Sequence, residues 1–213
     1  MKYVRILKDG APAWGVLEGE QVKTLARAPF DGVEYDGDSL PLNGCKLLVP
    51  CEPTKIVCIG KNYFDHIKEL GGGEVPDKPI LFIKALNTLN HPEGTIHAPD
   101  FVERLDYEGE LAFVIKKRAK DVKAEDFAEY ILGYTCLNDV TARDVQYSDG
   151  QWSRGKGMDG FAPVGPLVTD EIDALHADVI TRLNGKQVQR GNASQHIHPI
   201  PELLAFITAC ITL

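Results

Sequence analysis

The sequence has no excess of positive charge, and this absence narrows the classes of possible partner. Its 23 Lys and Arg residues are outnumbered by 31 Asp and Glu residues, which gives a formal net charge of -8. Such a charge disfavours nucleic acid and anionic membranes, so we expect neither as a partner. No apolar run is long enough to span a bilayer, and "MKYVRILKDG" turns polar too early for a signal peptide.

The cysteine patterns of disulfide-rich and zinc-binding proteins are also missing. The 5 cysteines form no Cys-x-x-Cys pair and are odd in number. We therefore expect reduced thiols and predict a cytoplasmic protein. With 44% hydrophobic residues in a chain of 213, there is enough apolar material for one main domain.

Several catalytic motifs are absent as well. There is no Gly-x-Ser-x-Gly elbow and no Cys/His protease signature, so a serine or cysteine nucleophile is not predicted. The "GGG" at 71–73 lacks the lysine and the spacing of a phosphate-binding loop. We interpret it as a hinge or lid.

Short strands separated by tight turns are present at the start of the chain. "KYVRIL", "AWGVL" and "QVKTL" are separated by "KDG" and "EGE", sequences typical of hairpin turns. A polar stretch at 28–44, containing Gly and Pro, is interpreted as a linker. Residues 1–45 are therefore predicted to form a small N-terminal β module, and residues 54–213 the main domain.

In the main domain, short apolar strands alternate with a few short helices. Strands are predicted at 54–60, in "ILFIKAL", at 105–117 and in "GYTCLNDV", and Asn184-Gly185 is predicted to turn a hairpin. Helices are predicted at 63–70, at 124–132, in "TARDVQYS" with Thr141 as its cap, and in "IPELLAFITACITL". The Gly- and Pro-containing segment 151–167 is expected to be irregular.

Two acidic residues begin a strand that otherwise reads as buried on both faces. Glu108 and Glu110 are two residues apart, so on a strand they project from the same face, and Asp139 ends another apolar strand. Three carboxylates suit Mg²⁺, Mn²⁺ or Ca²⁺ better than zinc, and a divalent cation would cancel their repulsion. Two alternatives stay open at this point: the Glu side chains pair with Lys or Arg, or the start of the strand is exposed.

Further polar residues could serve chemistry near these carboxylates. His66 and Glu69 lie one helical turn apart, an arrangement that suits a general base, although such pairs are also common on exposed helices. Arg143, Gln146 and Lys156 follow Asp139 and could hold an anionic substrate, or could simply be solvated. The "HIH" at 196–198 has metal-binding spacing without a third ligand, and we favour a loop role.

Read in order, these segments resemble the fumarylacetoacetate hydrolase family. The resemblance rests on "VCIGKNYFDHIKEL", "DYEGELAFVI", "GYTCLNDVTARDVQ", "QWSRGKGMDGFAPVGP" and "LNGKQVQRGNASQHIHPIPELLAFI", and covers the chain from about residue 54 to its end. The segment beginning "KYVRI" also looks like the small leading domain of many bacterial members. The resemblance implies a mixed, mainly β fold, a sandwich or barrel-like roll, and commonly a homodimer.

The resemblance also implies roles for individual residues. Glu108, Glu110 and Asp139 would be the ligands of a divalent metal, usually Mg²⁺ or Mn²⁺. His66 and Glu69 would be the catalytic dyad that activates a water or moves a proton, and Lys156 would contact the substrate's oxygen atoms. Arg143 and Gln146 match family positions near the substrate.

These roles lead to a predicted reaction. A metal bound to a 2-oxo acid stabilises the enolate of that acid. Because the sequence also contains the His66 and Glu69 dyad, which can direct a water, we predict hydrolysis of a carbon–carbon bond in a 2,4-dioxo acid of the acylpyruvate or fumarylpyruvate type. The alternatives on the same site are decarboxylation of an oxaloacetate-like 2-oxo acid and isomerisation of 2-hydroxyhepta-2,4-diene-1,7-dioate.

The chain departs from the family pattern at its end. Members usually continue into a "PGDxIxTGTPxG"-like stretch, whereas this sequence stops at Leu213 inside an apolar run. We therefore expect either a fragment or truncated product, or a chain whose missing strands come from elsewhere; in both cases the pocket of the chain alone is incomplete and its activity low. The alternative from a different class is an inactive remnant that binds metal or a partner.

Overall fold

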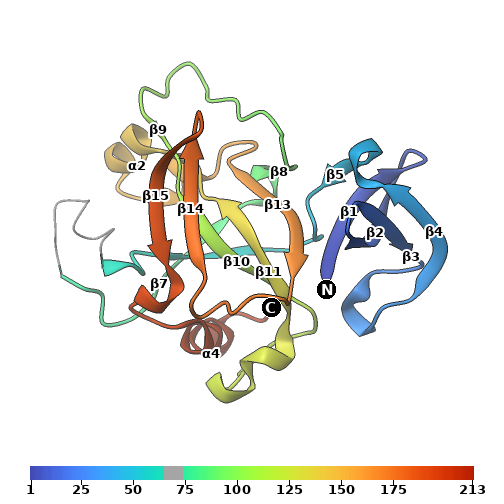
Figure 1. Ribbon diagram of the computed structural model, residues 1–213. Helices are drawn as coiled ribbons and strands as arrows, with labels where there is room; N and C mark the ends of the chain where they lie inside the picture. The colour runs from blue at the N-terminus through green and yellow to red at the C-terminus, as the bar shows by residue number, and fades with distance from the viewer. Residues whose placement is uncertain (65–73) are drawn as a thin grey trace.

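The fold is mainly β, with a few short helices, as the sequence predicts (Figure 1). This computed structural model describes residues 1–64 and 74–213. His66, Glu69 and the "GGG" at 71–73 therefore lie outside the described residues, as does most of the helix predicted at 63–70.

The N-terminal strands form successive antiparallel hairpins, drawn in blue in Figure 1. They are β1 (Lys2–Lys8), β2 (Ala11–Glu18), β3 (Gln21–Leu25), β4 (Tyr35–Pro41) and β5 (Lys46–Leu48). Strand β5 pairs with β1, and Val4, Ile6 and Val22 form a buried cluster between the hairpins. The segment 28–44 was predicted as a linker, but it contributes β4, which pairs with β3, so that prediction is wrong.

The central strands of the main domain continue the same sheet. Antiparallel β10 (Gly109–Ile115), β11 (Ile131–Asn138) and β13 (Ala162–Thr169) lie in the order β10-β11-β13-β1, so β13 joins them to the N-terminal strands. Strand β10 is at the edge of this sheet and all seven of its residues are half-buried. The prediction that this strand is fully buried on both faces is therefore wrong.

Smaller strand pairs surround this sheet. The pairs are β6 (Ile56–Gly60) with β7 (Ile80–Lys84), β9 (Leu105–Asp106) with β12 (Thr141–Ala142), and β14 (Asp178–Leu183) with β15 (Lys186–Asn192), while β8 (Leu89–Asn90) pairs with β13. Asn184 and Gly185 turn the β14–β15 hairpin with positive φ angles of 51° and 78°. The predicted hairpin is confirmed.

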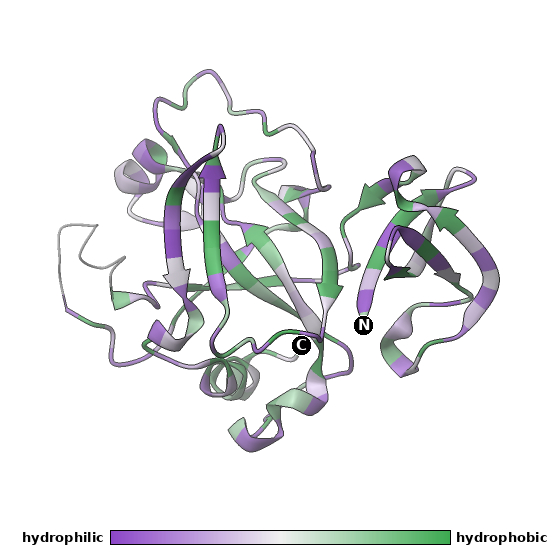
Figure 2. Ribbon diagram, in the orientation of Figure 1, coloured by the Kyte–Doolittle hydropathy of each residue, from purple (hydrophilic) through white to green (hydrophobic). Residues whose placement is uncertain are grey.

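The helices are short. Among the described residues, the α-helices are α2 (Arg143–Asp149), α3 (Trp152–Lys156) and α4 (Ile200–Cys210), and the 3₁₀-helices are η1 (Pro29–Asp31), η2 (Leu42–Gly44), η3 (Leu86–Thr88), η4 (Ala124–Tyr130) and η5 (Ala193–Gln195). Figure 2 shows α4 as mostly hydrophobic and β15 as mostly hydrophilic, in agreement with the burial of Leu203, Leu204 and Ile207. Over the described ranges, no helix has the length and hydrophobicity needed to cross a membrane.

Two predictions near Asp139 need correction. Thr141 does not cap α2: it lies in β12, and its hydroxyl donates to the carbonyl of Asp139. The segment 151–167 is not irregular, because it forms α3 and most of β13. Its glycines permit close packing as well as turns; Gly155, for example, is buried in α3.

Strand β11 approaches β13 closely at Gly133. A Cβ atom at Gly133 would lie 2.7 Å from the carbonyl oxygen of Thr169, which is a backbone atom and cannot rotate away. This close approach lies near the start of β11, the strand that ends just before Asp139.

We predict that Gly133→Ala destabilises the protein, because the added methyl forces β11 and β13 apart. Overpacking of this kind costs about 1–3 kcal/mol, and about 1 kcal/mol lowers Tm by 2–4 °C in a chain of this size. Thermal unfolding followed by circular dichroism measures the change. Gly44→Ala is the control, since its Cβ would be 3.9 Å from its nearest neighbour, Pro41 Cγ; equal Tm values for the two variants would contradict the prediction.

Candidate functional site

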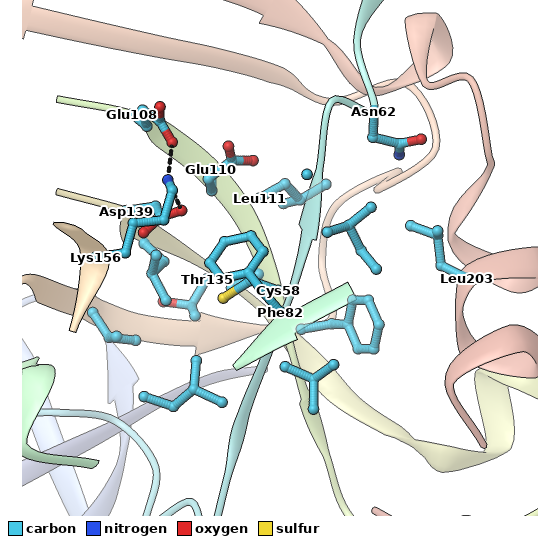
Figure 3. Close-up of a pocket in the computed structure, with 18 of the residues that line it drawn as sticks. Cys58, Asn62, Phe82, Glu108, Glu110, Leu111, Thr135, Asp139, Lys156 and Leu203 are labelled. Atoms are coloured by element: carbon cyan, nitrogen blue, oxygen red, sulfur yellow. Dashed lines mark hydrogen bonds and ion pairs between the residues drawn. The ribbon is translucent and has the colours of Figure 1, made fainter. Parts of the chain in front are cut away.

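The three predicted carboxylates lie together at one end of β10 and β11 (Figure 3). Glu108 precedes β10, Glu110 is the second residue of that strand, and Asp139 follows β11 directly. The amide of Asp139 donates to the carbonyl of Glu108 at 2.8 Å, and Glu110 pairs in register with Leu137. Backbone pairing thus places the three side chains beside one another, although Asp139 is about thirty residues from the two glutamates in sequence.

Lys156 lies between two of these carboxylates. Its Nζ donates to Glu108 Oε2 and Asp139 Oδ2, both at 2.6 Å, and to Thr141 Oγ1 at 2.9 Å. Burial alone would lower the pKa of Lys156, but Asp139 and Glu108 outweigh it and the net effect is a raised pKa. Lys156 is therefore a buried ammonium ion at neutral pH and acts as a cation and hydrogen-bond donor.

Arg143 holds Glu108 from the other side. The guanidinium donates to Asp106 Oδ2 at 2.8 Å, to Gln146 Oε1 at 2.7 Å and to Glu108 Oε1. Burial tends to raise the pKa of Glu108, but Lys156 and Arg143 outweigh it, so the net pKa is lowered and Glu108 is ionised. The structure thus brings the predicted Arg143 and Gln146 to the site, with Arg143 engaged by carboxylates.

Lys84, which the sequence analysis did not single out, provides a second lysine for Asp139. It ends β7 with a fully buried side chain, and its Nζ donates to Asp139 Oδ1 at 2.7 Å. Desolvation is the main reason why the pKa of Lys84 is lowered, and Asp139 partly opposes that effect. A lysine ending the apolar run "ILFIK" is the sequence signal that could have identified it.

Glu110 differs from its two neighbours because no cation is paired with it in the part of the chain that the structure describes. Removal from water raises its pKa to about 8, and Asp139 and Glu108 add to the effect, whereas Lys156 opposes it. The alternative in which both Glu residues pair with Lys or Arg therefore applies to Glu108 and, among the described residues, not to Glu110.

The donor set suits a hard divalent cation. Three carboxylates without His or Cys are typical of Mg²⁺, Mn²⁺ or Ca²⁺ ligation. Within residues 1–64 and 74–213, no group of three or more His, Cys, Asp or Glu side chains has the arrangement needed to hold a metal ion. The residues nevertheless fit the ion chemically, because Glu110 is a half-buried carboxyl with a raised pKa, and an added positive charge would lower the cost of ionising it.

A cavity of about 1330 Å³ extends from these polar residues along apolar walls. Figure 3 shows Phe82 and Cys58 next to the carboxylates and Leu203 at the far side. Phe82 packs edge-to-face on Trp152 with 5.2 Å between the ring centroids. Burial raises the pKa of Cys58 to about 12, so this thiol stays protonated at neutral pH, consistent with the prediction that no cysteine acts as nucleophile.

The "HIH" segment has a loop role. The ring nitrogen Nε2 of His198 lies 3.2 Å from the carbonyl of Pro76, and the backbone amide of His198 donates to Asn62 Oδ1 at 2.9 Å. His196 packs edge-to-face on Tyr63, with 4.6 Å between the ring centroids. Through these contacts, residues 196–198 are held against Asn62 and Tyr63 and against Pro76.

Comparison with known proteins agrees with the sequence resemblance. A family model described as fumarylacetoacetate (FAA) hydrolase C-terminal matches residues 55–213, and one described as Rv2993c-like, N-terminal matches residues 1–50. Protein Rv2993c of Mycobacterium tuberculosis is 40% identical over 223 residues, which cover 100% of this chain and 84% of that protein. Oxaloacetate tautomerase YisK of Bacillus subtilis is 36% identical over 210 residues, covering 93% of this chain and 70% of YisK.

Solved structures show the same similarity. The crystal structure of 5-carboxymethyl-2-hydroxymuconate delta-isomerase from Mycobacterium smegmatis superimposes with a TM-score of 0.93 and 37% identity, and the match covers 100% of this chain and 84% of that one. The predicted resemblance is confirmed, and the chain belongs to the fumarylacetoacetate hydrolase family.

Proposed function

We propose that the protein is a divalent-metal-dependent enzyme that acts on a 2-oxo acid through its enolate, and that keto–enol tautomerisation or isomerisation is its reaction. The observation that carries the proposal is the cluster of Glu108, Glu110 and Asp139, two of which bind the buried Lys156, in the lining of a cavity. Relatives named oxaloacetate tautomerase and hydroxymuconate isomerase support it, because both names describe a proton shift next to a carbonyl.

In this proposal the described residues have distinct tasks. Glu108, Glu110 and Asp139 hold Mg²⁺ or Mn²⁺, with Ca²⁺ as a third candidate. When bound, the cation supplies a Lewis acid that lowers the cost of negative charge on the substrate's keto oxygen. Lys156 is ionised and donates a hydrogen bond to the oxygen-rich end of the substrate in exchange for one of its three present acceptors, and Arg143 keeps Glu108 in place.

Hydrolysis is the second candidate, favoured by the His66 and Glu69 pair in the sequence. Cleaving a 2,4-dioxo acid needs a water directed at a second carbonyl, in addition to the stabilised enolate. Tautomerisation and decarboxylation do not need that water. We rank tautomerisation first because the described residues supply enolate stabilisation and because the relatives named above are a tautomerase and an isomerase.

Metal binding should stabilise the folded protein. We predict that Mn²⁺ at about one hundred times its Kd raises the free energy of unfolding by about 2.7 kcal/mol, and that EDTA reverses the effect. Differential scanning fluorimetry measures Tm in each condition. A Tm that does not respond to Mn²⁺, Mg²⁺ or Ca²⁺ would rule out the metal site and favour a purely charge-paired cluster.

Glu110→Gln should change stability in opposite directions with and without metal. In metal-free buffer the variant should melt several degrees higher at neutral pH, because it removes a carboxyl that burial and two neighbouring carboxylates destabilise. The same variant should lose most of the Mn²⁺-dependent increase. Glu125→Gln, an exposed residue of η4, is the matched control and should behave like the wild type.

Lys156→Met should lower kcat for oxaloacetate tautomerisation by about one-hundredfold, the usual effect of removing one oxyanion-stabilising donor. Ultraviolet absorbance of the enol follows this reaction, and acylpyruvate hydrolysis and dienedioate isomerisation are assayed in parallel with Mg²⁺. The exposed Lys186→Met is the control.

His66→Ala separates the two candidate reactions. If the variant retains tautomerisation and the wild type does not hydrolyse acylpyruvates, the tautomerase proposal stands. If the wild type hydrolyses acylpyruvates faster than it tautomerises oxaloacetate, and His66→Ala abolishes that hydrolysis, the hydrolase is the correct function.

A further inference from the structure

The side chain of Gln189 binds the backbone of the glycine that separates the two clustered glutamates. Gln189 Oε1 accepts a hydrogen bond from the amide of Gly109 at 2.8 Å, and Nε2 donates to the carbonyl of Gly109, also at 2.8 Å. One amide side chain on β15 thus satisfies both polar backbone groups of Gly109. The Gln189 side chain thus forms the two hydrogen bonds with β10 that the backbone of a neighbouring strand would form.

Gly109 needs such a partner because of its place on the edge strand. Glu108 is already held on the β11 side, where its carbonyl accepts from Asp139 and its amide donates to Asn138 Oδ1 at 3.0 Å. Strand β10 has β11 on one side and is the edge of its sheet on the other. Unpaired backbone groups in a half-buried position are costly, so the contact with Gln189 stabilises this conformation of residues 108–110.

Two further features fix the geometry of this contact. The hydroxyl of Thr181 on β14 donates to Gln189 Oε1 at 2.8 Å, which sets the orientation of the amide. At Gly109, a Cβ atom would overlap Thr181 Oγ1 and lie 3.0 Å from Gln189 Oε1, so the approach requires a glycine. Tyr107 adds a hydrogen bond from its hydroxyl to the carbonyl of Val188 at 3.2 Å, so β15 holds the chain on both sides of Glu108.

We infer that Gln189, oriented by Thr181, is a positioning residue that fixes the Glu108-Gly109-Glu110 backbone so that both carboxylates face the metal site. The inference rests on the proposed function, since it concerns the same cation. Gln189 acts through the backbone of Gly109, in the way that outer-shell partners orient metal ligands elsewhere. The β14–β15 hairpin therefore has a task in the site although it contributes no ligand.

The test compares Mn²⁺ affinity among variants of the full chain, using the electron paramagnetic resonance signal of free Mn²⁺. Gln189→Met keeps the size of the side chain and removes both hydrogen bonds; it should raise Kd about tenfold. Gln187→Met, at an exposed position of the same strand, is the matched control and should leave Kd unchanged. Tm of each metal-free variant is measured in parallel to separate positioning from general loss of stability.

Thr181→Val provides a second, milder variant that keeps the fold even if Gln189→Met does not. It should raise Kd about threefold, and in the Gln189→Met background it should add nothing, because Thr181 acts only through Gln189. If the two substitutions raise the Kd for Mn²⁺ additively, Thr181 does not act through Gln189 and that part of the inference is wrong.

The outcomes separate this inference from the proposed function. If the wild type binds Mn²⁺ and Gln189→Met binds it equally well, with or without a lower Tm, Gln189 has only a structural role and the inference is wrong, while the metal site stands. If the wild type does not bind Mn²⁺, the proposed function fails and the inference fails with it.

Discussion

The mutual repulsion of three carboxylates at one end of β10 and β11 is the constraint on which the rest of the site depends. Strand pairing places Glu108, Glu110 and Asp139 side by side, where water cannot screen them fully. The surrounding elements supply the compensating charge: Lys84 at the end of β7 and Lys156 at the end of α3. Glu110 is left without a paired cation among the described residues, which makes the cluster suited to one more positive charge.

The sheet and the helices that follow β11 have separate tasks in this arrangement. The sheet fixes the acidic residues through backbone hydrogen bonds, and the hairpin β14–β15 completes that frame by holding Gly109. The helices that follow β11 bring cations and an amide to the lining of a large cavity with apolar walls. The proposed 2-oxo acid would match this division, since its oxygen-rich end would meet the charged residues and its remaining carbon atoms would meet Phe82 and Leu111, which line the cavity.

Local sequence patterns predicted part of this structure, and long-range contacts decided the rest. The period-two spacing of Glu108 and Glu110 and the end of the apolar run before Asp139 were sufficient to propose a shared site, and Asn184-Gly185 identified its hairpin. Lys84 and Gln189 could not be placed in the same way, because Lys84 is 55 residues from its partner Asp139 in sequence and Gln189 is 80 residues from Gly109. Thr141 shows the same limit: its residue type suits a helix cap, but pairing with β9 places it in a strand.

A crystal structure with Mn²⁺ and oxalate tests the central claim most directly, because oxalate mimics the two adjacent oxygen atoms of a 2-oxo acid and manganese is located by its anomalous scattering. The account predicts one anomalous peak bonded to carboxylate oxygens of Glu108, Glu110 and Asp139, with oxalate on the same ion and Lys156 Nζ within hydrogen-bond distance of it. A peak bonded to other residues, or oxalate bound in the cavity with no manganese at these three carboxylates, would contradict it.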